Sequence, residues 1–93
     1  MAQFLVEAYV ARSNGSDLTR VVGRLHLAAE TLTSSNVPVR YLRSILVPAD
    51  ETCFHLFESP SIEAVEEIGR CAELTFARVT EAVEPAIFEG GTR

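Results

Sequence analysis

The 93 residues predict a single α+β domain with the order strand, helix, strand, strand, helix, strand. Two observations support this prediction. Four segments rich in β-branched and aromatic residues alternate in the manner of strands, and two other segments repeat apolar residues at helical spacing. A chain of this length builds one modest hydrophobic core and leaves no room for a second domain.

The first half of the chain predicts one strand and one helix. Residues 3–11 form the strand, and residues 12–16 are rich in turn-forming types. Apolar residues then recur at helical spacing over about 18–32. The polar residues 33–36 end this helix because their side chains compete for backbone hydrogen bonds.

The second half predicts a hairpin, a helix and a last strand. The segments are a strand over 39–47 after Pro38, a turn over 48–51, a strand over 52–58, a helix that begins at Ser59-Pro60, and a strand over about 75–83. Ser59 offers a capping hydroxyl, and proline fits the first helical position because its missing N–H loses nothing there. We therefore assign the folded domain to residues 1–84 and a flexible C-terminal tail to residues 85–93.

This order is the ferredoxin-like plan, a βαββαβ sandwich with a four-stranded antiparallel sheet. The plan implies that the strands lie in the order fourth, first, third, second. Two helices cover only one face of such a sheet. The other face is either in water or covered by a second subunit. The second arrangement is a dimeric α/β barrel, which encloses a space between two sheets.

Alternation along the strands assigns the side chains to two faces. The apolar set is expected to fill the core: Phe4, Val6, Ala8, Val10, Leu42, Leu46, Phe54 and Leu56. The uncovered face is expected to carry a ligand pocket lined by polar side chains: Glu7, Tyr9, Tyr41, Arg43, His55 and Glu81, with Cys53 beside them. Carboxylates, phenols, a guanidinium, a thiol and an imidazole are more typical of a lined cavity than of a solvated surface.

The composition excludes several classes of function. The net charge is −5, from eight arginines and no lysine against thirteen acidic residues, so the chain lacks the basic surface that nucleic acids require. Without lysine there is no Schiff-base or pyridoxal chemistry, and no organic cofactor is expected. The first residues do not resemble a signal peptide, and no apolar run is long enough for a bilayer. Two cysteines make no disulfide framework, so we expect a reduced, cytoplasmic protein without a membrane partner.

The stretch from Tyr41 to Ser61 carries a resemblance. It contains Tyr-Leu-Arg-Ser at 41–44 and Val-Pro-Ala-Asp-Glu-Thr-Cys-Phe-His-Leu-Phe-Glu-Ser-Pro-Ser at 47–61, and residues 4–7 and 78–83 add to it. The chain resembles a bacterial family of small, largely uncharacterised ferredoxin-like proteins described as nickel-binding. The resemblance implies the same fold, a homodimer, and a metal ion near the subunit contact, with nickel as the first choice. It identifies no metal ligand in this sequence residue by residue.

Cys53 and His55 are the candidate metal ligands. Because they lie two apart in a strand, both side chains point to the same side, with Cβ atoms roughly 6–7 Å apart. Thiolate and imidazole together suit Ni²⁺, Cu²⁺ or Zn²⁺. A third ligand would come from Glu7 or from a symmetry-related chain. The alternative is that Cys53 only packs, as free cysteines often do.

Glu7, His55 and Glu81 are also expected to cluster, since the first strand lies between the third and the last. Such a cluster suits a general base, with Arg43 or a tyrosine stabilising an anion. The alternatives are an ion pair that closes a dimer interface and a ligand contact without catalysis.

These observations lead to a homodimer that binds a small ligand or a divalent metal, nickel first, on the uncovered sheet face. The alternative is a cofactor-free oxygenase, isomerase or cyclase of the dimeric α/β-barrel type, acting on a small hydrophobic carbonyl compound. In that enzyme His55 or Glu7 is the base, and Arg43 or Tyr41 stabilises the anion. A third possibility is a structural accessory subunit, because one fold hosts many functions.

Overall fold

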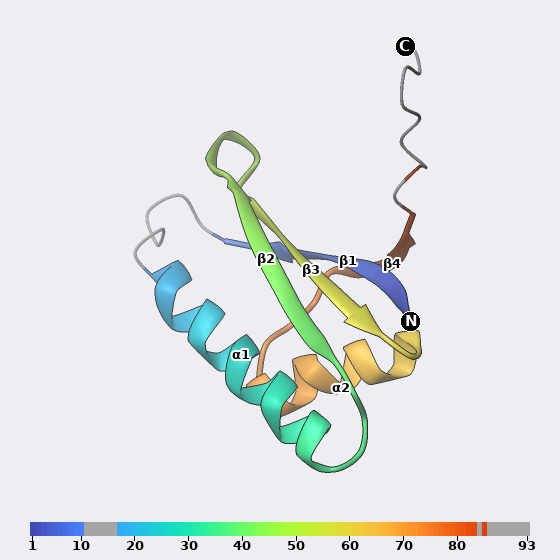
Figure 1. Cartoon of the computed structure of the whole chain (residues 1–93). Helices are drawn as coiled ribbons and strands as arrows, with labels where there is room; N and C mark the ends of the chain where they lie inside the picture. The colour runs from blue at the N-terminus through green and yellow to red at the C-terminus, as the bar shows by residue number, and fades with distance from the viewer. Residues whose placement is uncertain (11–16, 84, 86–93) are drawn as a thin grey trace.

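The computed structural model describes residues 1–10, 17–83 and 85. Its elements are β1 (Ala2–Tyr9), α1 (Leu18–Ser34), β2 (Arg40–Val47), the short 3-10 helix η2 (Pro48–Asp50), β3 (Thr52–Ser59), α2 (Ile62–Ala72) and β4 (Arg78–Ala82) (Figure 1). The order confirms the predicted α+β fold with four strands and two helices, which fits the ferredoxin-like plan. The predicted turn over 12–16 and nearly all of the predicted tail over 85–93 lie outside the described residues.

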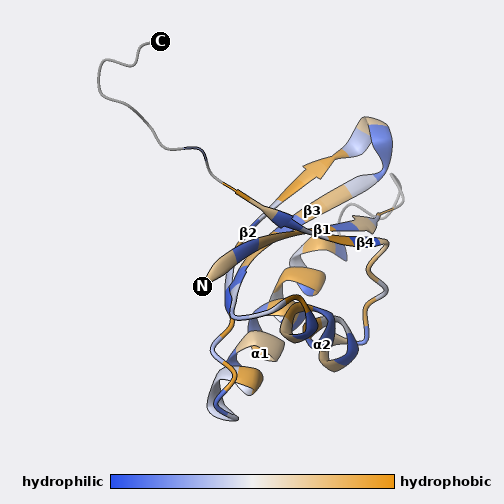
Figure 2. Ribbon diagram, turned by 90° about the vertical axis from the view of Figure 1, so that its right-hand side faces the viewer, coloured by the Kyte–Doolittle hydropathy of each residue, from blue (hydrophilic) through white to orange (hydrophobic). Residues whose placement is uncertain are grey.

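The four strands form one antiparallel sheet in the order β2-β3-β1-β4, as predicted. Both helices lie against the same face of this sheet (Figures 1 and 2). The other face carries no helix in the part of the chain that the structure describes. Neither described helix has the length and apolar character needed to cross a bilayer. The cytoplasmic location stays a prediction.

The core lies between the sheet and the two helices. Helix α1 contributes Leu25 and Leu32, and helix α2 contributes Val65 and Ile68. Phe4 and Val6 from β1 are buried against them, which confirms their predicted place in the core. Burial of such side chains stabilises the fold by roughly 1.5–3 kcal/mol each.

Strand β3 has the opposite facing from the one predicted. Phe54 and Leu56 are only half-buried and lie on the uncovered face, whereas Cys53, His55 and Phe57 are fully buried on the helix side. The register explains this result, because Phe4 pairs with Phe57 and Val6 pairs with His55. Residues directly opposite one another in a sheet share a face. The apolar residues of β3 occupy both faces, so the hydrophobic pattern alone predicted the wrong face for the core.

A β-bulge changes the facing within β2. Tyr41 pairs with Phe57 on the helix side, but Arg43 pairs with Leu56 on the uncovered side. Leu42, which was predicted to lie in the core, is the extra residue between them and is half-buried. The bulge therefore separates Tyr41 from Arg43, which simple alternation had placed together. It also brings Ser44 to the helix side, next to His55.

Helix α2 begins two residues later than predicted. The N-cap is Ser61, whose Oγ accepts a hydrogen bond from the backbone N–H of Ala64 at 3.2 Å. Ser59 is instead the last residue of β3, and its hydroxyl donates to the carbonyl oxygen of Ser61 at 2.8 Å. The helix ends at Ala72, and the C-cap residue Glu73 has a left-handed φ of 58°, which is typical of a residue after a helix.

Candidate functional site

The sheet divides the predicted site residues into two groups. Glu7 and Arg43 lie on the uncovered face, where their register partners are Phe54 and Leu56 respectively. Tyr41, Cys53 and His55 face the helices. Glu81 lies opposite the core residue Phe4 and therefore also on the helix side, at the edge of the sheet. The prediction that all of them gather on the uncovered face is therefore wrong for Tyr41, Cys53, His55 and Glu81.

The predicted cluster of Glu7, His55 and Glu81 does not form within the chain. Glu7 approaches Arg78 of β4, with 3.7 Å between Oε2 and Nη1. Glu81 is exposed and pairs with Phe4 in the register of β1 and β4. His55 lies one strand away from β4 and on the side of the sheet opposite Glu7. These three residues therefore share no proton in the described chain.

His55 instead ends a short chain of hydrogen bonds. Its Nδ1 lies 2.6 Å from the Oγ of Ser44, and this Oγ lies 2.5 Å from the hydroxyl oxygen of Tyr41. The Sγ of Cys53 is 3.9 Å from the same Nδ1. The other ring nitrogen, Nε2, is buried and has no hydrogen-bond partner among the described residues. Burial lowers the pKa of His55 to about 4, so the ring is neutral at pH 7.

His55 forms part of the wall of a pocket, which we call the His55 pocket. Its volume is about 370 Å³, and its walls come from the end of β1, the start of α1 and the segment between α2 and β4. The lining residues are Ala8, Tyr9, Val10, Val21, His55, Leu74, Thr75, Phe76 and Ala77. The volume is within the usual range for a small-ligand site, and most of these side chains are apolar.

Two contacts hold the segment between α2 and β4 against the rest of the molecule. The backbone N–H of Ala77 donates to the carbonyl oxygen of Glu7 at 2.8 Å. The ring of Phe76 lies so close to Gly69 that a Cβ on Gly69 would be only 3.0 Å from Phe76 Cε2. The absence of a side chain at Gly69 therefore lets Phe76 take its place in the pocket wall.

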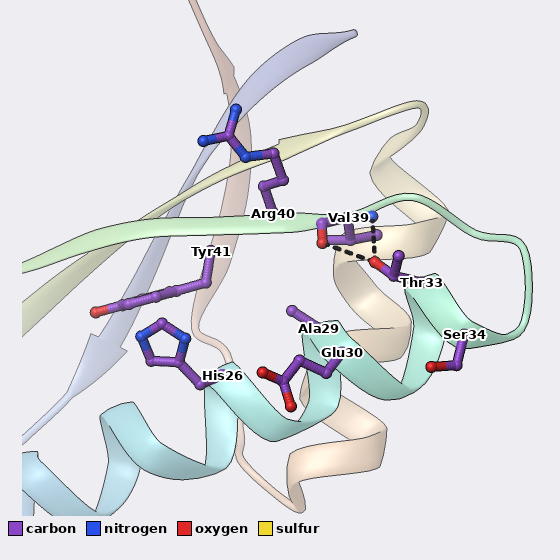
Figure 3. Close-up of a pocket in the computed structure, with 8 residues that line it drawn as sticks. All are labelled: His26, Ala29, Glu30, Thr33, Ser34, Val39, Arg40 and Tyr41. Atoms are coloured by element: carbon purple, nitrogen blue, oxygen red, sulfur yellow. Dashed lines mark hydrogen bonds between the residues drawn. The ribbon is translucent and has the colours of Figure 1, made fainter.

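A second hollow lies between α1 and the start of β2 (Figure 3). It measures about 490 Å³, and its walls include His26, Glu30 and Tyr41. The ring centroids of His26 and Tyr41 are 4.6 Å apart at an interplanar angle of 66°. Arg40 extends to the side of β2 away from His26, which shows the alternation of the two faces (Figure 3). This groove is more open than the His55 pocket, and both His26 and Glu30 are exposed.

The described residues contain no group of three or more His, Cys, Asp or Glu side chains placed to hold one metal ion. Cys53 and His55 do share a face, as predicted, but it is the covered face. Burial also raises the pKa of the Cys53 thiol, which disfavours the thiolate that a metal ion requires.

The uncovered face of the sheet is more apolar than predicted. Its central positions are Leu5 on β1, Ile45 on β2, and Phe54 and Leu56 on β3. All four are at least partly exposed, and Ile45 is 55% exposed. Charged side chains surround this patch: the pair Arg40–Glu58 with 3.0 Å between nitrogen and oxygen, the pair Glu7–Arg78, and Arg43.

Ser44 and the segment Leu74–Ala77 were not predicted to belong to a site. Ser44 had a usable signal, since it is the only aliphatic hydroxyl in the segment 39–47. Residues 75–77 were predicted to begin the last strand, but β4 begins at Arg78, and the position of this segment at the end of β1 results from the tertiary fold.

Comparison with known proteins supports the fold. No protein-family model matches the chain, and no curated protein sequence matches it. One solved structure that resembles it is the crystal structure of SCO4226 from Streptomyces coelicolor A3(2), with a TM-score of 0.74 and 23% sequence identity. The match covers 91% of this chain and 100% of that one. At this identity the likeness shows a shared fold over almost the whole domain.

Proposed function

We propose that this chain binds a small, mainly apolar molecule in the His55 pocket. The observation that carries the proposal joins two features of one residue: His55 lines a pocket of about 370 Å³, and its buried Nε2 has no hydrogen-bond partner among the described residues. A buried nitrogen without a partner costs roughly 1–3 kcal/mol relative to a bonded one. A bound ligand with one suitable polar atom would remove this cost.

The lining fits the rest of such a ligand. Val21, Leu74 and Phe76 are partly buried apolar residues that pack against the core and also line the pocket. Small-ligand sites commonly combine an apolar wall with very few polar groups, which fix the orientation of the ligand. His55 is the one fully buried polar side chain among these lining residues.

The test is a titration followed by nuclear magnetic resonance of ¹⁵N-labelled protein. The probes are acetophenone and α-methylstyrene, two apolar fragments of the same shape. We expect at least one fragment to shift the amide signals of His55 and of Leu74–Ala77. Val21→Trp should fill the pocket and weaken this binding at least tenfold. Leu27→Trp, on an exposed position of the same helix, is the matched control and should leave it unchanged.

If neither fragment shifts the signals of the lining residues, the pocket is not a binding site for this class of molecule. Equal binding to wild type and Val21→Trp would also contradict the proposal, because the fragments would then bind elsewhere.

We also propose that two copies associate through their uncovered sheet faces, as in a dimeric α/β barrel. The patch of Leu5, Ile45, Phe54 and Leu56 supports this proposal, because a contiguous apolar patch with a charged rim is typical of a protein interface. The ion pairs at its edge would set the relative orientation of the two copies. Light scattering of dilute protein would test this association.

Nickel binding is a second candidate function. The observation that favours it is the 3.9 Å distance between Cys53 Sγ and His55 Nδ1, since this pair brings two suitable donor types together. The remaining ligands would have to come from another copy or from solvent. Uptake of one Ni²⁺ per chain, lost in Cys53→Ser, would support the site, and no uptake above a buffer control would exclude it.

The enzyme alternative uses the same pocket. Glu7 and Arg43 lie on the face of the sheet opposite to His55. Among the described residues, His55 is therefore the one predicted general base that lines the pocket. Turnover of a bound carbonyl compound, lost in His55→Gln, would distinguish an enzyme from a binding protein.

A further inference from the structure

We infer that His55 directs an N–H group into its pocket, and that the ligand is an apolar molecule with a neutral hydrogen-bond acceptor such as a ketone, aldehyde, ester or amide carbonyl. This inference rests on the proposed function, because it names the class of molecule that the same pocket would take. The direction of the hydrogen-bond chain through Tyr41 and Ser44 determines which ring nitrogen of His55 carries the proton.

The first step is the short contact between Ser44 and His55. The distance from Oγ to Nδ1 is 2.6 Å, below the usual range of about 2.7–3.2 Å for an N–H donor and an oxygen acceptor. The contact is a close hydrogen bond in which either atom could donate, so its direction depends on the next partner along the chain.

The second step is the contact between Tyr41 and Ser44, at 2.5 Å. A phenol has a pKa near 10 and is more acidic than an aliphatic alcohol, so the Tyr41 hydroxyl is the better donor of the two. If Tyr41 donates to the Ser44 oxygen, the single hydroxyl proton of Ser44 is left for Nδ1. The donor strength of Tyr41 thus favours one direction, from Tyr41 through Ser44 to His55.

The third step is the protonation state of the ring. A neutral imidazole carries one proton, and when Nδ1 accepts a hydrogen bond that proton must be on Nε2. Neutrality follows from burial together with the surroundings: the described lining residues include no Asp, Glu, Lys or Arg. The Cys53 thiol, with its Sγ 3.9 Å from Nδ1, is kept in its uncharged form by burial.

The chemistry of the ligand follows from this tautomer. A protonated Nε2 donates a hydrogen bond and has no lone pair for a metal ion, so it would not hold nickel on that nitrogen. An anionic ligand would lose its hydration in a mainly apolar pocket whose described lining residues carry no positive charge, which is unfavourable. A carbonyl oxygen satisfies the donor without that penalty.

The first test measures the tautomer in the wild-type protein without any ligand. Labelled imidazole nitrogens give different ¹⁵N chemical shifts for the protonated and the bare position. We expect at pH 7 a protonated Nε2 and an unprotonated Nδ1 in His55. The reverse tautomer would overturn the inference and leave the proposed binding site in place.

The second test compares the two fragments named above. α-Methylstyrene carries a C=CH₂ group where acetophenone carries a C=O, so the pair differs mainly in the hydrogen-bond acceptor. We expect the ratio of the two dissociation constants to favour acetophenone more in wild type than in His55→Phe, by roughly three- to tenfold. Leu27→Phe introduces the same side chain at an exposed position of α1 outside the pocket lining, and it is the control that should keep the wild-type ratio.

The outcomes separate the two proposals. An unchanged ratio in His55→Phe, with both fragments bound in the pocket, would overturn the ligand class alone. Failure of both fragments to bind would overturn the proposed function and the ligand class with it, whichever tautomer is found.

Discussion

A fully buried imidazole with one nitrogen bonded and the other bare is an unusual residue for the core of a small protein. His55 has no exposed surface, and its Nε2 finds no partner among the described side chains and backbone groups. Net stabilities of single domains are only about 5–15 kcal/mol, so one unsatisfied buried nitrogen is a noticeable loss. An apolar side chain at this position would fill the same space without that loss. This cost favours a role for His55 in ligand binding over a role in core packing alone.

The buried state of His55 predicts a specific dependence of stability on pH. The pKa of His55 is lowered by burial to about 4, whereas in the unfolded chain it is near 6.5. Between these values the unfolded state binds the proton and the folded state does not. Above pH 6.5, His55 therefore causes no loss in the free energy of unfolding. The free energy falls as the pH is lowered from 6.5 to 4, and below pH 4 His55 causes no further change. The total loss is up to about 3 kcal/mol.

Urea unfolding at pH 7, 6, 5 and 4 would measure this effect. The free energy of unfolding of wild type should fall relative to that of His55→Gln by about 2–3 kcal/mol over this range. The glutamine variant has its own stability offset, but this offset does not change with pH at this position. Parallel curves for the two proteins would show that His55 is accessible to protons in the folded state.

At the residue scale, the sequence identified the right types of side chain but assigned some of them to the wrong face. His55 was selected because an imidazole in an apolar strand is chemically notable, and it does line a pocket. Its facing depends on the pairing of β3 with β1, which places His55 opposite Val6. A shift of one residue in register exchanges the two faces of a strand. Because both faces of β3 carry apolar residues, the pattern in that strand did not define the register.

At the scale of elements, boundaries were easier to predict than irregularities. The periods of the apolar residues gave β1, β2, β3 and α1 to within about two residues. The bulge at Tyr41–Arg43 was not predicted, since a bulge inserts one residue without changing the composition of the strand. That bulge determines whether Ser44 reaches His55, so the hydrogen-bond chain was not predictable from alternation.

The two described helices offer a matched test of how α2 supports the pocket. Gly23 in α1 has open space where a Cβ would be, with nothing within 4 Å. At Gly69 in α2 a Cβ would lie 3.0 Å from Phe76 Cε2 and 3.3 Å from the carbonyl oxygen of Leu74. Gly23→Ala should raise the free energy of unfolding by about 0.5–1 kcal/mol, because alanine loses less conformational entropy in a helix.

Gly69→Ala has the same gain in helix propensity but also forces Phe76 to move. Overpacking of this kind costs roughly 1–3 kcal/mol, so Gly69→Ala should be less stable than Gly23→Ala by about that amount. Thermal or urea unfolding of the two variants beside wild type measures the difference. Equal gains for both would mean that the segment Leu74–Ala77 yields freely, and that Gly69 does not determine the shape of the pocket wall.

At the scale of the whole molecule, the sheet separates two kinds of surface. Both helices lie on one side of the sheet (Figure 2). That side holds the core and the His55 pocket, whereas the uncovered side presents an apolar patch with charged edges. The fold and the strand order were predictable because an open four-stranded sheet with two crossover helices has few allowed arrangements. The sequence could not predict what covers the second face, because a chain that associates with itself and a chain that binds a different partner can present the same apolar patch.

The proposed dimer gives the last prediction, which concerns Leu56. This residue lies in the middle of the uncovered face, between Arg43 on β2 and Leu5 on β1. Light scattering of wild type at micromolar concentration should give twice the chain mass of 10.2 kDa. Leu56→Glu should give the mass of one chain with unchanged far-ultraviolet circular dichroism, because a dimer would bury the new carboxylate without a partner. Leu27 on α1 is 64% exposed, so the control variant Leu27→Glu makes the same change away from the sheet and should remain dimeric. A wild-type protein that is monomeric at this concentration would contradict the dimer, and it would leave the His55 pocket as a site complete within one chain.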